Sequence, residues 1–438
     1  MIMRFRWETG FKESEIGKIP KDWEVKRIEE IADVSTGGTP SRKKKEYWGG
    51  NIKWVKSQEV RNRFIWDTEE TITEEAMKNS NAKRIYPPNT VLVALYGATA
   101  GEISLLKIPA TINQAIAALE GKKVDNLFLF YSMLGNKDRL KDLAIGSAQQ
   151  NLYLKDIKEF EIPILTTKEE QTRIATVLSW FDDLIENKRK QNEILEKIAM
   201  AIFKSWFIDF EPFQDEEFVY NEELDMEIPK GWEVKPIGEV ADATSGFSYK
   251  SSEKLESPEP ESYVFITLNN TVEGGGFKPV YSWVKSERIK KKHLIKEGDL
   301  ILPNTEQTKD ARLLGSPGIV VFPPDYNKNY GVYSMDIVKV TPIKDHYKYY
   351  LYFNFRFNRE EIATFHSGTN ILHFKIQNFK KNYYLLIPPR PILQRFHSLV
   401  EPIFQKIILN QKQILTLKKI RDTLLPQLVF GRLRVEDI

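Results

Sequence analysis

The chain has 438 residues, 41% of them hydrophobic, with a formal net charge of +3 and no cysteine. That length predicts about two to three globular domains, and the lack of cysteine excludes disulfides, thiolate metal sites and a cysteine nucleophile. The small net charge excludes a surface that is basic throughout, so binding to a polyanion would depend on local clusters. No signal-peptide pattern and no apolar run of about 18 residues occurs, so we expect a cytoplasmic protein without a membrane span.

A long segment occurs twice. Residues 19–37 read IPKDWEVKRIEEIADVSTG, and residues 228–246 read IPKGWEVKPIGEVADATSG, with 12 of 19 positions identical at a spacing of 209 residues. This period is too long for a solenoid repeat, so it predicts a duplicated, domain-sized module. Each half of the chain should then have its own core.

The first module, from residue 19 to about 165, contains short apolar runs such as NTVLVALYG and EISLLKIPATINQAIAAL, separated by Gly, Pro and Asn. This pattern predicts a mixed α/β domain. Residues 42–63 hold eight Lys or Arg and only two Glu, with Tyr47, Trp48 and Trp54 among them. Such a cluster suits phosphate contacts, although a solvated charged loop explains it as well.

A long helix should follow at residues 166–210, which contain no Gly or Pro. Thr166 or Thr167 would begin it with a capping box. Its apolar residues alternate four and three apart, with a polar interruption near the middle. These seam positions are Ile174, Leu178, Phe181, Ile185, Lys188, Asn192, Leu195, Ala199, Ile202 and Trp206. Heptad spacing of this kind predicts a partner helix.

The second half repeats the plan. A second mixed α/β stretch contains another basic segment, residues 283–298, with six Lys or Arg against two Glu, and residues 391–430 then return to heptad spacing. The second seam comprises Phe396, Val400, Ile403, Ile407, Asn410, Ile414, Leu417, Arg421, Leu424 and Leu428. Pro402 and Pro426 should bend or fray this helix and leave Ile403–Leu425 straight. The alternative is that each helix packs only on its own domain.

No catalytic motif is complete. The repeated Glu-Val-Lys lacks the separate upstream carboxylate of a metal-dependent nuclease, and no Pro-Pro segment has the residues that an amino-methyltransferase needs. Gly97 and Gly101 are not followed by the Lys-Ser/Thr of a phosphate-binding loop, and the five histidines show no metal-ligand spacing. We therefore expect a protein that is not an enzyme, with no metal site.

The order of several segments resembles the specificity subunit of type I restriction-modification systems. FKESEIGKIPKDWEV, STGGTPSR, LYGATAGEISL, TINQAIAAL and GSAQQNLYLKDIKEFEIPI are similar to successive parts of its target-recognition domain. NEILEKIAMAIFKSWFIDFEP and IRDTLLPQLVFGRLRV are similar to its two helix ends. The second module differs in its loops, with TSGFSYKSSEKL and PNTEQTKDARLLG at the corresponding places.

The resemblance implies a mixed α+β chain with two target-recognition domains, residues 1–165 and 215–390. Two long antiparallel coiled-coil helices, residues 166–214 and 391–438, would separate them about a pseudo-two-fold axis. It implies a DNA reader without catalytic activity that holds methyltransferase subunits and, through them, nuclease subunits. S-adenosylmethionine, ATP and Mg²⁺ would act only in those partners. Matching frameworks with different loops predict an asymmetric, bipartite double-stranded DNA target.

We expect polar loop residues to read the DNA, because Arg and Lys suit guanine edges and Asn and Gln suit adenine edges. The alternative for each of them is a turn residue or a phosphate contact, which we expect more often than base reading. In the first module these are Thr39, Ser41, Arg42, Lys43, Lys44, Lys45, Tyr47, Lys56, Gln58, Arg61, Tyr96, Thr99, Ser147, Gln149, Gln150 and Asn151. In the second they are Ser248, Lys250, Asn304, Gln307, Thr308, Lys309, Arg312, Thr369, Asn370 and His373. Asn113 and Gln114 are expected inside an apolar strand, with a structural role at least as plausible as DNA contact.

Two other functions compete with DNA reading. A two-headed scaffold would use its helices to assemble other proteins, and its basic loops would be incidental. An orphan methyltransferase with unrecognised motifs is the more distant alternative. DNA binding with and without a methyltransferase partner separates the three.

Overall fold

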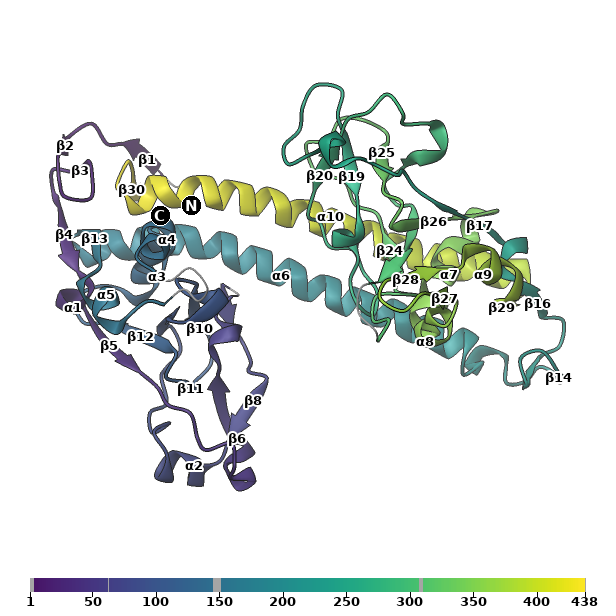
Figure 1. Ribbon diagram of the computed structural model, residues 1–438, viewed down its shortest axis with the longest axis horizontal. Helices are drawn as coiled ribbons and strands as arrows, with labels where there is room; N and C mark the ends of the chain where they lie inside the picture. Colours follow the sequence, from purple (N-terminus) through teal and green to yellow (C-terminus); the bar gives the residue numbers. More distant parts are fainter. Residues whose placement is uncertain (1–3, 62, 145–150, 307–309, 438) are drawn as a thin grey trace. The chain divides into compact units, whose positions relative to one another are not determined.

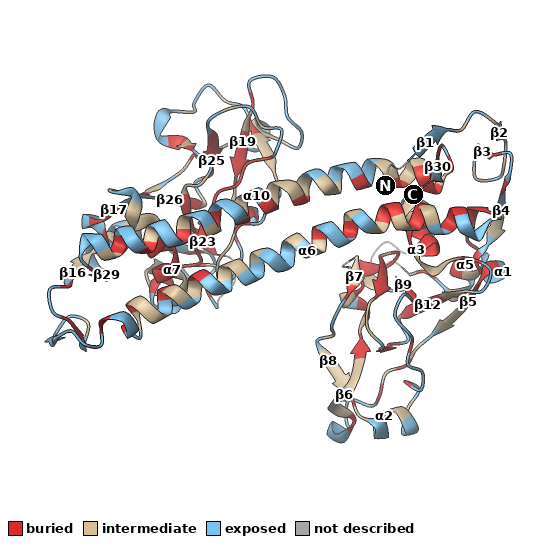
Figure 2. Ribbon diagram, turned by 180° about the vertical axis from the view of Figure 1, so that it is seen from behind, coloured by how far each residue is buried: buried red, intermediate tan, exposed pale blue. Residues whose placement is uncertain are grey.

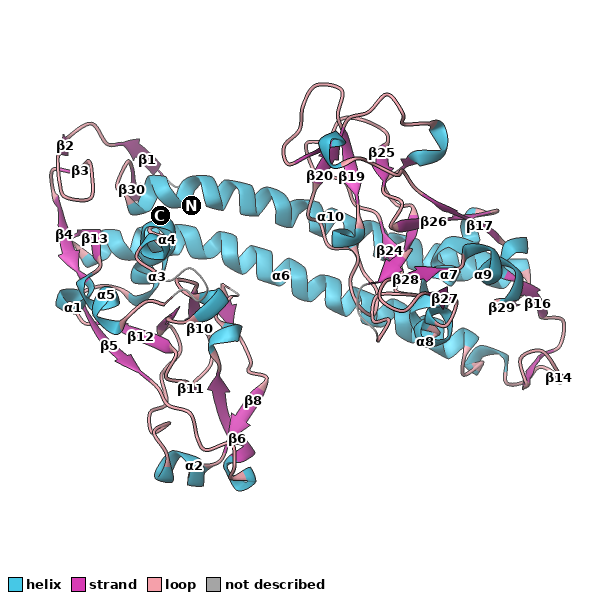
Figure 3. Cartoon of the chain, viewed as in Figure 1, coloured by secondary structure: helices cyan, strands magenta, loops and turns pink. Residues whose placement is uncertain are grey.

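The computed structural model describes residues 4–61, 63–144, 151–306 and 310–437 (Figure 1). The chain forms two compact units. Unit 1 consists of Met1–Asp183 with Lys418–Ile438, and unit 2 consists of Leu184–Leu417. Helices and strands occur together in both units (Figure 3), which confirms the mixed α/β prediction.

Unit 1 is built around a five-stranded sheet. Its strands follow the order β5 (Ala32–Thr36), β12 (Ile116–Gly121), β9 (Val91–Ala94), β10 (Ile103–Leu106) and β7 (Phe64–Ile65). All four residues of β9 are buried, because their side chains alternate between two hydrophobic clusters on opposite faces of the sheet. The apolar run NTVLVALYG therefore contains a strand, as its β-rich composition predicted, and the sheet places that strand at its centre.

A smaller sheet carries the basic segment of unit 1. It has the order β11 (Thr111–Ile112), β6 (Trp48–Val55) and β8 (Glu70–Ile72), with β6 parallel to β11 and antiparallel to β8. The other strand pairs of the unit are β1 (Arg4–Trp7) with β30 (Leu433–Asp437), β2 (Phe11–Lys12) with β3 (Ile19–Pro20), and β4 (Trp23–Arg27) with β13 (Glu161–Leu165). Its short helices are α1 (Ile28–Ile31), α2 (Glu74–Asn79), α3 (Asn126–Gly135), α4 (Lys137–Asp142) and α5 (Leu154–Glu159).

Unit 2 also contains two main sheets, and their strand orders are similar to those of unit 1. Its first sheet runs β17 (Ala241–Ser245), β26 (Ile337–Pro342), β22 (Leu300–Pro303), β24 (Gly318–Ile319). Its second sheet runs β18 (Lys254–Leu255), β20 (Ser282–Val284), β19 (Tyr263–Ile266), β25 (Gly331–Tyr333), β21 (Leu294–Ile295), with β19 parallel to β25 as β6 is to β11. The remaining elements are β14 (Phe218–Asn221) with β15 (Met226–Pro229), β16 (Glu233–Pro236) with β29 (Tyr384–Ile387), β23 (Thr305–Glu306) with β28 (Leu372–Phe374) and β27 (His366–Ser367), and helices α7 (Lys348–Phe357), α8 (Arg359–Ala363) and α9 (Ile376–Asn382).

The duplicated sequence forms the entry to each module. In unit 1 it supplies β4, which pairs with β13, the strand that ends the module; in unit 2 it supplies β16, which pairs likewise with β29. The repeated tryptophan is buried in both places: Trp23 packs edge-on against Phe128, and Trp232 packs against Phe207. The repeated sequence thus supplies, in each module, the entry strand that pairs with the strand ending the module.

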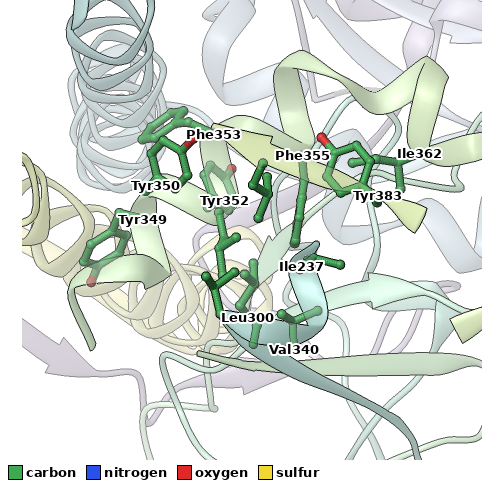
Figure 4. Packing of buried hydrophobic residues seen from close by; sticks show 14 of the residues in the cluster. Ile237, Leu300, Val340, Tyr349, Tyr350, Tyr352, Phe353, Phe355, Ile362 and Tyr383 are labelled. Carbon is green, nitrogen blue, oxygen red and sulfur yellow. The ribbon is translucent and has the colours of Figure 1, made fainter. Parts of the chain in front are cut away.

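Aromatic residues dominate the core of unit 2. Helix α7 reads KYYLYFNFRF, and all of its aromatic residues except Phe357 are buried. Figure 4 shows Tyr350, Tyr352 and Phe353 of α7 in the same buried cluster as Leu300 and Val340 of the first sheet. Burial on this scale is favourable by roughly 25 cal/mol per Å² of apolar surface, so α7 is a main source of stability for the unit.

Two helices of 40 residues confirm the heptad prediction: α6 (Lys168–Phe207) and α10 (Arg390–Val429). At about 1.5 Å per residue each is about 60 Å long. Every seam position predicted from the sequence is buried or half-buried, and Figure 2 shows buried residues recurring along one side of both helices. The helices contribute packed segments to both units. Among the described residues, no helix has the length and apolar character needed to cross a membrane.

The polar interruptions of the two seams meet each other. Asn410 Nδ2 donates to Asn192 Oδ1 at 2.8 Å, and Lys188 Nζ donates to Gln413 Oε1 at 2.5 Å. As α6 advances from Lys188 to Asn192, its partner position moves back from Gln413 to Asn410, so the helices are antiparallel here. A buried amide pair of this kind disfavours shifted alignments, in which each amide would face an apolar side chain.

The predicted fraying of α10 at its prolines is wrong. The helix is continuous through Pro402 and Pro426 and is not limited to 403–425. Pro402 cannot donate to the carbonyl of Ser398, but both residues are exposed, so water can satisfy that carbonyl. Pro426 lies in the last turn of the helix, where its carbonyl still accepts from the N–H of Phe430 at 3.3 Å.

Candidate functional site

Loops that are distant in sequence meet at one edge of the sheets in unit 1. Leu152 N donates to Leu95 O at 2.8 Å, and Leu95 N donates to Ala115 O at 2.9 Å. Asn113 N in turn donates to Val55 O at 3.0 Å. We call the polar edge of unit 1 the segments 38–45, 56–61, 96–99, 113–115 and 151, which flank these bonds.

The glycine-rich loop reaches this edge because two glycines let it pass close to other backbone. A Cβ on Gly37 would lie 1.8 Å from Ile112 O, and a Cβ on Gly38 would lie 2.4 Å from Asn81 C. Gly38 N donates to Ile112 O at 2.9 Å. The loop therefore places Thr39 beside Gln114, where its hydroxyl donates to Gln114 Oε1 at 2.5 Å.

Asn113 and Gln114 do not lie inside a strand, contrary to expectation. They form the turn between β11 and β12, in which Asn113 is buried and Gln114 is exposed. Asn113 has a structural role, since its Oδ1 accepts from Ala115 N at 3.0 Å. The exposed side chain of Gln114 lies on the polar edge of unit 1.

The predicted contact residues at positions 96, 99 and 151 have different environments. Tyr96 is 38% exposed and forms an isolated β-bridge with Asn151, which is half-buried. Thr99 is buried, with its hydroxyl 3.5 Å from Tyr96 O. Ser147, Gln149 and Gln150 lie outside the described residues.

Arg42 is held by an acidic partner from another strand. Its Nη1 and Nη2 donate to the two carboxylate oxygens of Glu70 at 2.6 and 2.8 Å, and its guanidinium carbon lies 3.7 Å from the ring centre of Trp48. The hydrogen bond from Arg42 lowers the pKa of the Glu70 carboxyl below its usual value. The guanidinium is thus stacked and paired in the absence of any ligand.

Carboxylates after residue 63 offset more of the basic cluster. Lys56 Nζ lies 2.5 Å from Glu69 Oε2, and Lys53 pairs with Asp67. A charge count over residues 42–63 alone misses these partners, because β6 and β8 bring them together only in the fold. The exposed cationic surface is therefore smaller than the sequence count indicates.

The lysine run keeps most of its charge exposed. Lys43 and Lys45 are exposed, with no ion pair among the described residues, whereas Lys44 Nζ donates to the hydroxyl of the buried Tyr47 at 2.9 Å. The other predicted contacts of this segment, Ser41, Gln58 and Arg61, are exposed. This loop is the part of unit 1 best suited to phosphate contacts.

Unit 2 has a polar edge with the same backbone hydrogen bonds. Phe374 N donates to Asn304 O at 2.9 Å, and Asn304 N donates to Asp336 O at 2.7 Å. Ser334 N donates to Ile266 O at 2.9 Å. The polar edge of unit 2 comprises segments 247–250, 304–306, 334–336 and 369–373.

The predicted residues of unit 2 lie mostly exposed on this edge. Ser248, Lys250, Thr369, Asn370 and His373 are exposed. His373 lies on β28, opposite Thr305 of β23. The exposed Arg312 pairs with Asp310 at 3.1 Å, and Gln307, Thr308 and Lys309 lie outside the described residues.

Asn304 borders a cavity of about 840 Å³. Its Nδ2 donates to Met335 O at 2.7 Å, while its buried Oδ1 has no partner in the described part of the chain. The lining consists of Ala243, Thr244, Ser245, Lys292, Asn304, Phe374, Lys375, Ile376, Gln377 and Asn378. Two ammonium groups among hydroxyls and amides favour an anionic or strongly hydrogen-bonding ligand.

The second basic segment also divides into paired and free cations. Arg288 Nε donates to Glu253 Oε1 at 3.0 Å, and hydrogen bonds from Arg288, Ser286 and the backbone of Lys250 together lower the pKa of Glu253 to about 2. Lys290, Lys291 and Lys292 are exposed, with no ion pair among the described residues. This segment therefore resembles the lysine run of unit 1, residues 43–45, because both expose several lysine side chains.

The repeated Glu-Val-Lys is internally paired. Lys26 Nζ lies 3.0 Å from Glu24 Oε2, and Lys235 pairs with Glu233 in the same way. Within the described ranges, no group of three or more His, Cys, Asp or Glu residues could hold a metal ion. The two polar edges present hydrogen-bonding side chains and exposed lysines.

The comparisons with known proteins match the chain to specificity proteins of type I restriction-modification systems. The family described as type I restriction modification DNA specificity domain matches residues 20–197 and 229–419. The chain is 44% identical to the type I restriction enzyme MjaIX specificity subunit of Methanocaldococcus jannaschii, over 100% of the chain and 99% of that protein. The EcoR124I/EcoR124II specificity subunit of Escherichia coli is 31% identical over 44% of the chain and 50% of its own length.

A solved structure shares the fold. The crystal structure of the type I restriction-modification S subunit from M. genitalium matches 93% of the chain and 96% of that subunit, with a TM-score of 0.57 at 18% identity.

Proposed function

The chain belongs to the type I restriction-modification DNA specificity family, and from this premise we propose that its two polar edges bind the two halves of an asymmetric DNA target. The observation that supports this proposal is the duplicated edge itself. The backbone hydrogen bonds of the two edges match, whereas the side chains that they present differ. Equal frameworks with different side chains suit two half-sites of different sequence.

Affinity and sequence preference come from different parts of each edge. The exposed lysines at 43, 45 and 290–292 contact phosphates, which supply affinity for any duplex. The amide and hydroxyl side chains beside them, together with Arg312, read base edges in the major groove. Ser147, Gln149, Gln150, Gln307 and Thr308, which lie on the undescribed segments 145–150 and 307–309, belong to this second group.

The partners are methyltransferase subunits and, through them, the nuclease subunits of a restriction enzyme. The faces of the long helices that point away from their mutual seam carry exposed apolar side chains at helical spacing. These are Trp180, Leu184, Ile194 and Ile198 on α6 and Leu399, Leu409 and Ile420 on α10. Apolar stripes on long helices suit packing against helices of another protein.

The chain itself performs no catalysis in this proposal. Its partners bind S-adenosylmethionine, ATP and Mg²⁺ and modify or cut the DNA that this subunit selects. Because that DNA is chromosomal or invading DNA inside a cell, the complex works in the cytoplasm.

Binding-site selection tests the proposal. The full chain, alone and with its co-expressed methyltransferase subunits, is incubated with a library of random duplexes, and the bound duplexes are sequenced. We expect the complex to enrich one bipartite sequence with two unlike halves, and methyl transfer only when the partner is present. Partner binding without any sequence enrichment would support the scaffold alternative, and methylation by the isolated chain would overturn the non-catalytic assignment.

A further inference from the structure

The turn at the polar edge of unit 1 is tied to the strands around it. Asn113 N bonds to Val55 O, and Ala115 O accepts from Leu95 N at 2.9 Å. Inside the turn, Asn113 Oδ1 accepts from Ala115 N at 3.0 Å, and Ile116 N lies 3.4 Å from Asn113 O. These bonds hold the backbone of the turn and leave the side chain of Gln114 exposed.

The turn in unit 2 repeats this arrangement bond by bond. Ser334 N bonds to Ile266 O, Asp336 O accepts from Asn304 N, and Ile337 N donates to Ser334 O at 3.0 Å. The side chain of Ser334 replaces that of Asn113, since its Oγ lies 3.3 Å from Asp336 N. The residue left exposed at the centre of this turn is Met335.

Gln114 and Met335 therefore occupy equivalent positions. The neighbouring bonds agree, because Gly38 N donates to Ile112 O in unit 1 and Phe247 N donates to Tyr333 O in unit 2. The flanking sequences INQAI and YSMDI share only their final isoleucine, so the equivalence depends on backbone contacts.

The side chain of Met335 is a large apolar group on the surface of unit 2. Met335 is 43% exposed. Its backbone is fully engaged, since its N–H donates to Phe247 O at 3.0 Å and its carbonyl accepts from Asn304 Nδ2 at 2.7 Å. A side chain on such a fixed backbone projects from a defined point, which a reading residue needs.

Resting on the proposed function, we propose that Gln114 and Met335 are a matched pair of specificity-determining residues, one for each half-site. Gln114 reads an A·T pair: its Oε1 accepts from Thr39, and its Nε2 remains to donate to adenine N7. Met335 makes an apolar contact with a thymine methyl group. Thr39 is a positioning residue, which orients the amide of Gln114.

The test is binding-site selection on the full chain in complex with its methyltransferase subunits, using Gln114→Met and Met335→Gln. Gln114→Met should reduce the preference for one A·T pair in one half-site by about tenfold or more and leave the other half-site unchanged. Met335→Gln should change one position of the opposite half-site. Unchanged preference at every position in both variants, with folding intact by thermal unfolding, would overturn the proposal.

Further variants separate reading from folding. Gln114→Glu should shift the preference towards C·G, because a carboxylate accepts from cytosine N4 but cannot donate to adenine N7. Thr39→Val should broaden the preference at the same position and create no new one. Gln394→Met and Met226→Gln make the same chemical changes at exposed sites outside the polar edges and should preserve the preferred sequence.

These results also separate the inference from its premise. If the unmodified complex enriches no sequence, the proposed function fails, and the paired assignment fails with it. If the unmodified complex is specific and all variants of Gln114 and Met335 select the same sequence, only the paired assignment fails.

Discussion

Arg42 shows how the fold limits the charge of a basic loop. Its bidentate pairing with Glu70 and its stacking on Trp48 withhold one cation from the surface. Removing the acidic partner with Glu70→Gln should therefore raise affinity for all duplexes alike. If Arg42 then gains one phosphate contact, the slope of log K against log salt should steepen by about 0.9. Fluorescence titration at several salt concentrations measures this slope, and an unchanged slope with altered sequence preference would identify Arg42 as a base reader instead.

The same ion pair should respond to acid. Because Arg42 lowers the pKa of Glu70 below its usual 4.5, the pairing stabilises the loop fully above that value and is lost as pH falls through the lowered pKa. The unmodified protein should therefore show a change in Trp48 environment below about pH 4.5 that Glu70→Gln lacks. The difference between their fluorescence titrations isolates this step from other tryptophans, and coincident titrations would contradict it.

Neutralising the lysine run tests the division between affinity and preference. Replacing Lys43, Lys44 and Lys45 by Gln should weaken binding to every sequence by a similar factor and reduce the salt slope by up to about 0.9 per lost phosphate contact. Arg312→Gln is the comparison, because we expect it to relax one half-site only. Competition binding with specific and random duplexes measures both effects, and a new preferred sequence in the lysine variant would reverse the assignment.

At the scale of elements, Asp182 joins α6 to its surroundings in unit 1. Its carboxylate accepts from Arg421 of α10 at 2.6 Å, from Arg63 at 2.8 Å and from the Tyr131 hydroxyl at 2.7 Å, and its side chain is 1% exposed. Burial, together with this carboxylate, raises the pKa of Tyr131, so its hydroxyl stays a donor. One buried acid thus connects both long helices and α3.

Asp182→Asn should destabilise unit 1 by about 3–5 kcal/mol, because it leaves Arg63 without its anionic partner and leaves the buried Arg421 only the more exposed Asp422. Asp183→Asn is the matched control, since that neighbour is exposed and its loss should change stability by less than about 0.5 kcal/mol. Hydrogen exchange of α3 under urea reports the stability of this unit. Equal effects of the two substitutions would show that the buried cluster contributes no more than the exposed charge.

Local patterns predicted the helices well but not the contacts within the polar edges. The seams of α6 and α10 follow from heptad spacing, and even Arg421 was placed on the seam, but its partner Asp182 lies beside the predicted position Phe181 and was not identified. The acidic partners of the basic loop depend on the pairing of β6 with β8, which no local pattern encodes. The equivalence of Gln114 and Met335 is defined by backbone hydrogen bonds, which leave no trace in side-chain identity.

At the scale of the whole molecule, both long helices run from one unit into the other. The boundary falls between Asp183 and Leu184 in α6 and between Leu417 and Lys418 in α10. Contacts on either side of it are specific: Asp182 pairs with Arg421 in unit 1, and Lys188 pairs with Gln413 in unit 2. We therefore expect the length of the two continuous helices to determine the preferred distance between the two half-sites.

Inserting one heptad at the boundary in both helices tests this role. Seven residues keep the seam in register and add about 10 Å at roughly 1.5 Å per residue. At about 3.4 Å per base pair, the preferred target should then gain about three pairs between its halves, provided that DNA twist absorbs the rotation. Selection from a library of spacer lengths measures the optimum. A heptad inserted in α6 alone is the control, because it offsets the seam by two turns and should abolish bipartite binding. An unchanged optimum in the double insertion would mean that the helices serve only to pack the chain and its partners together.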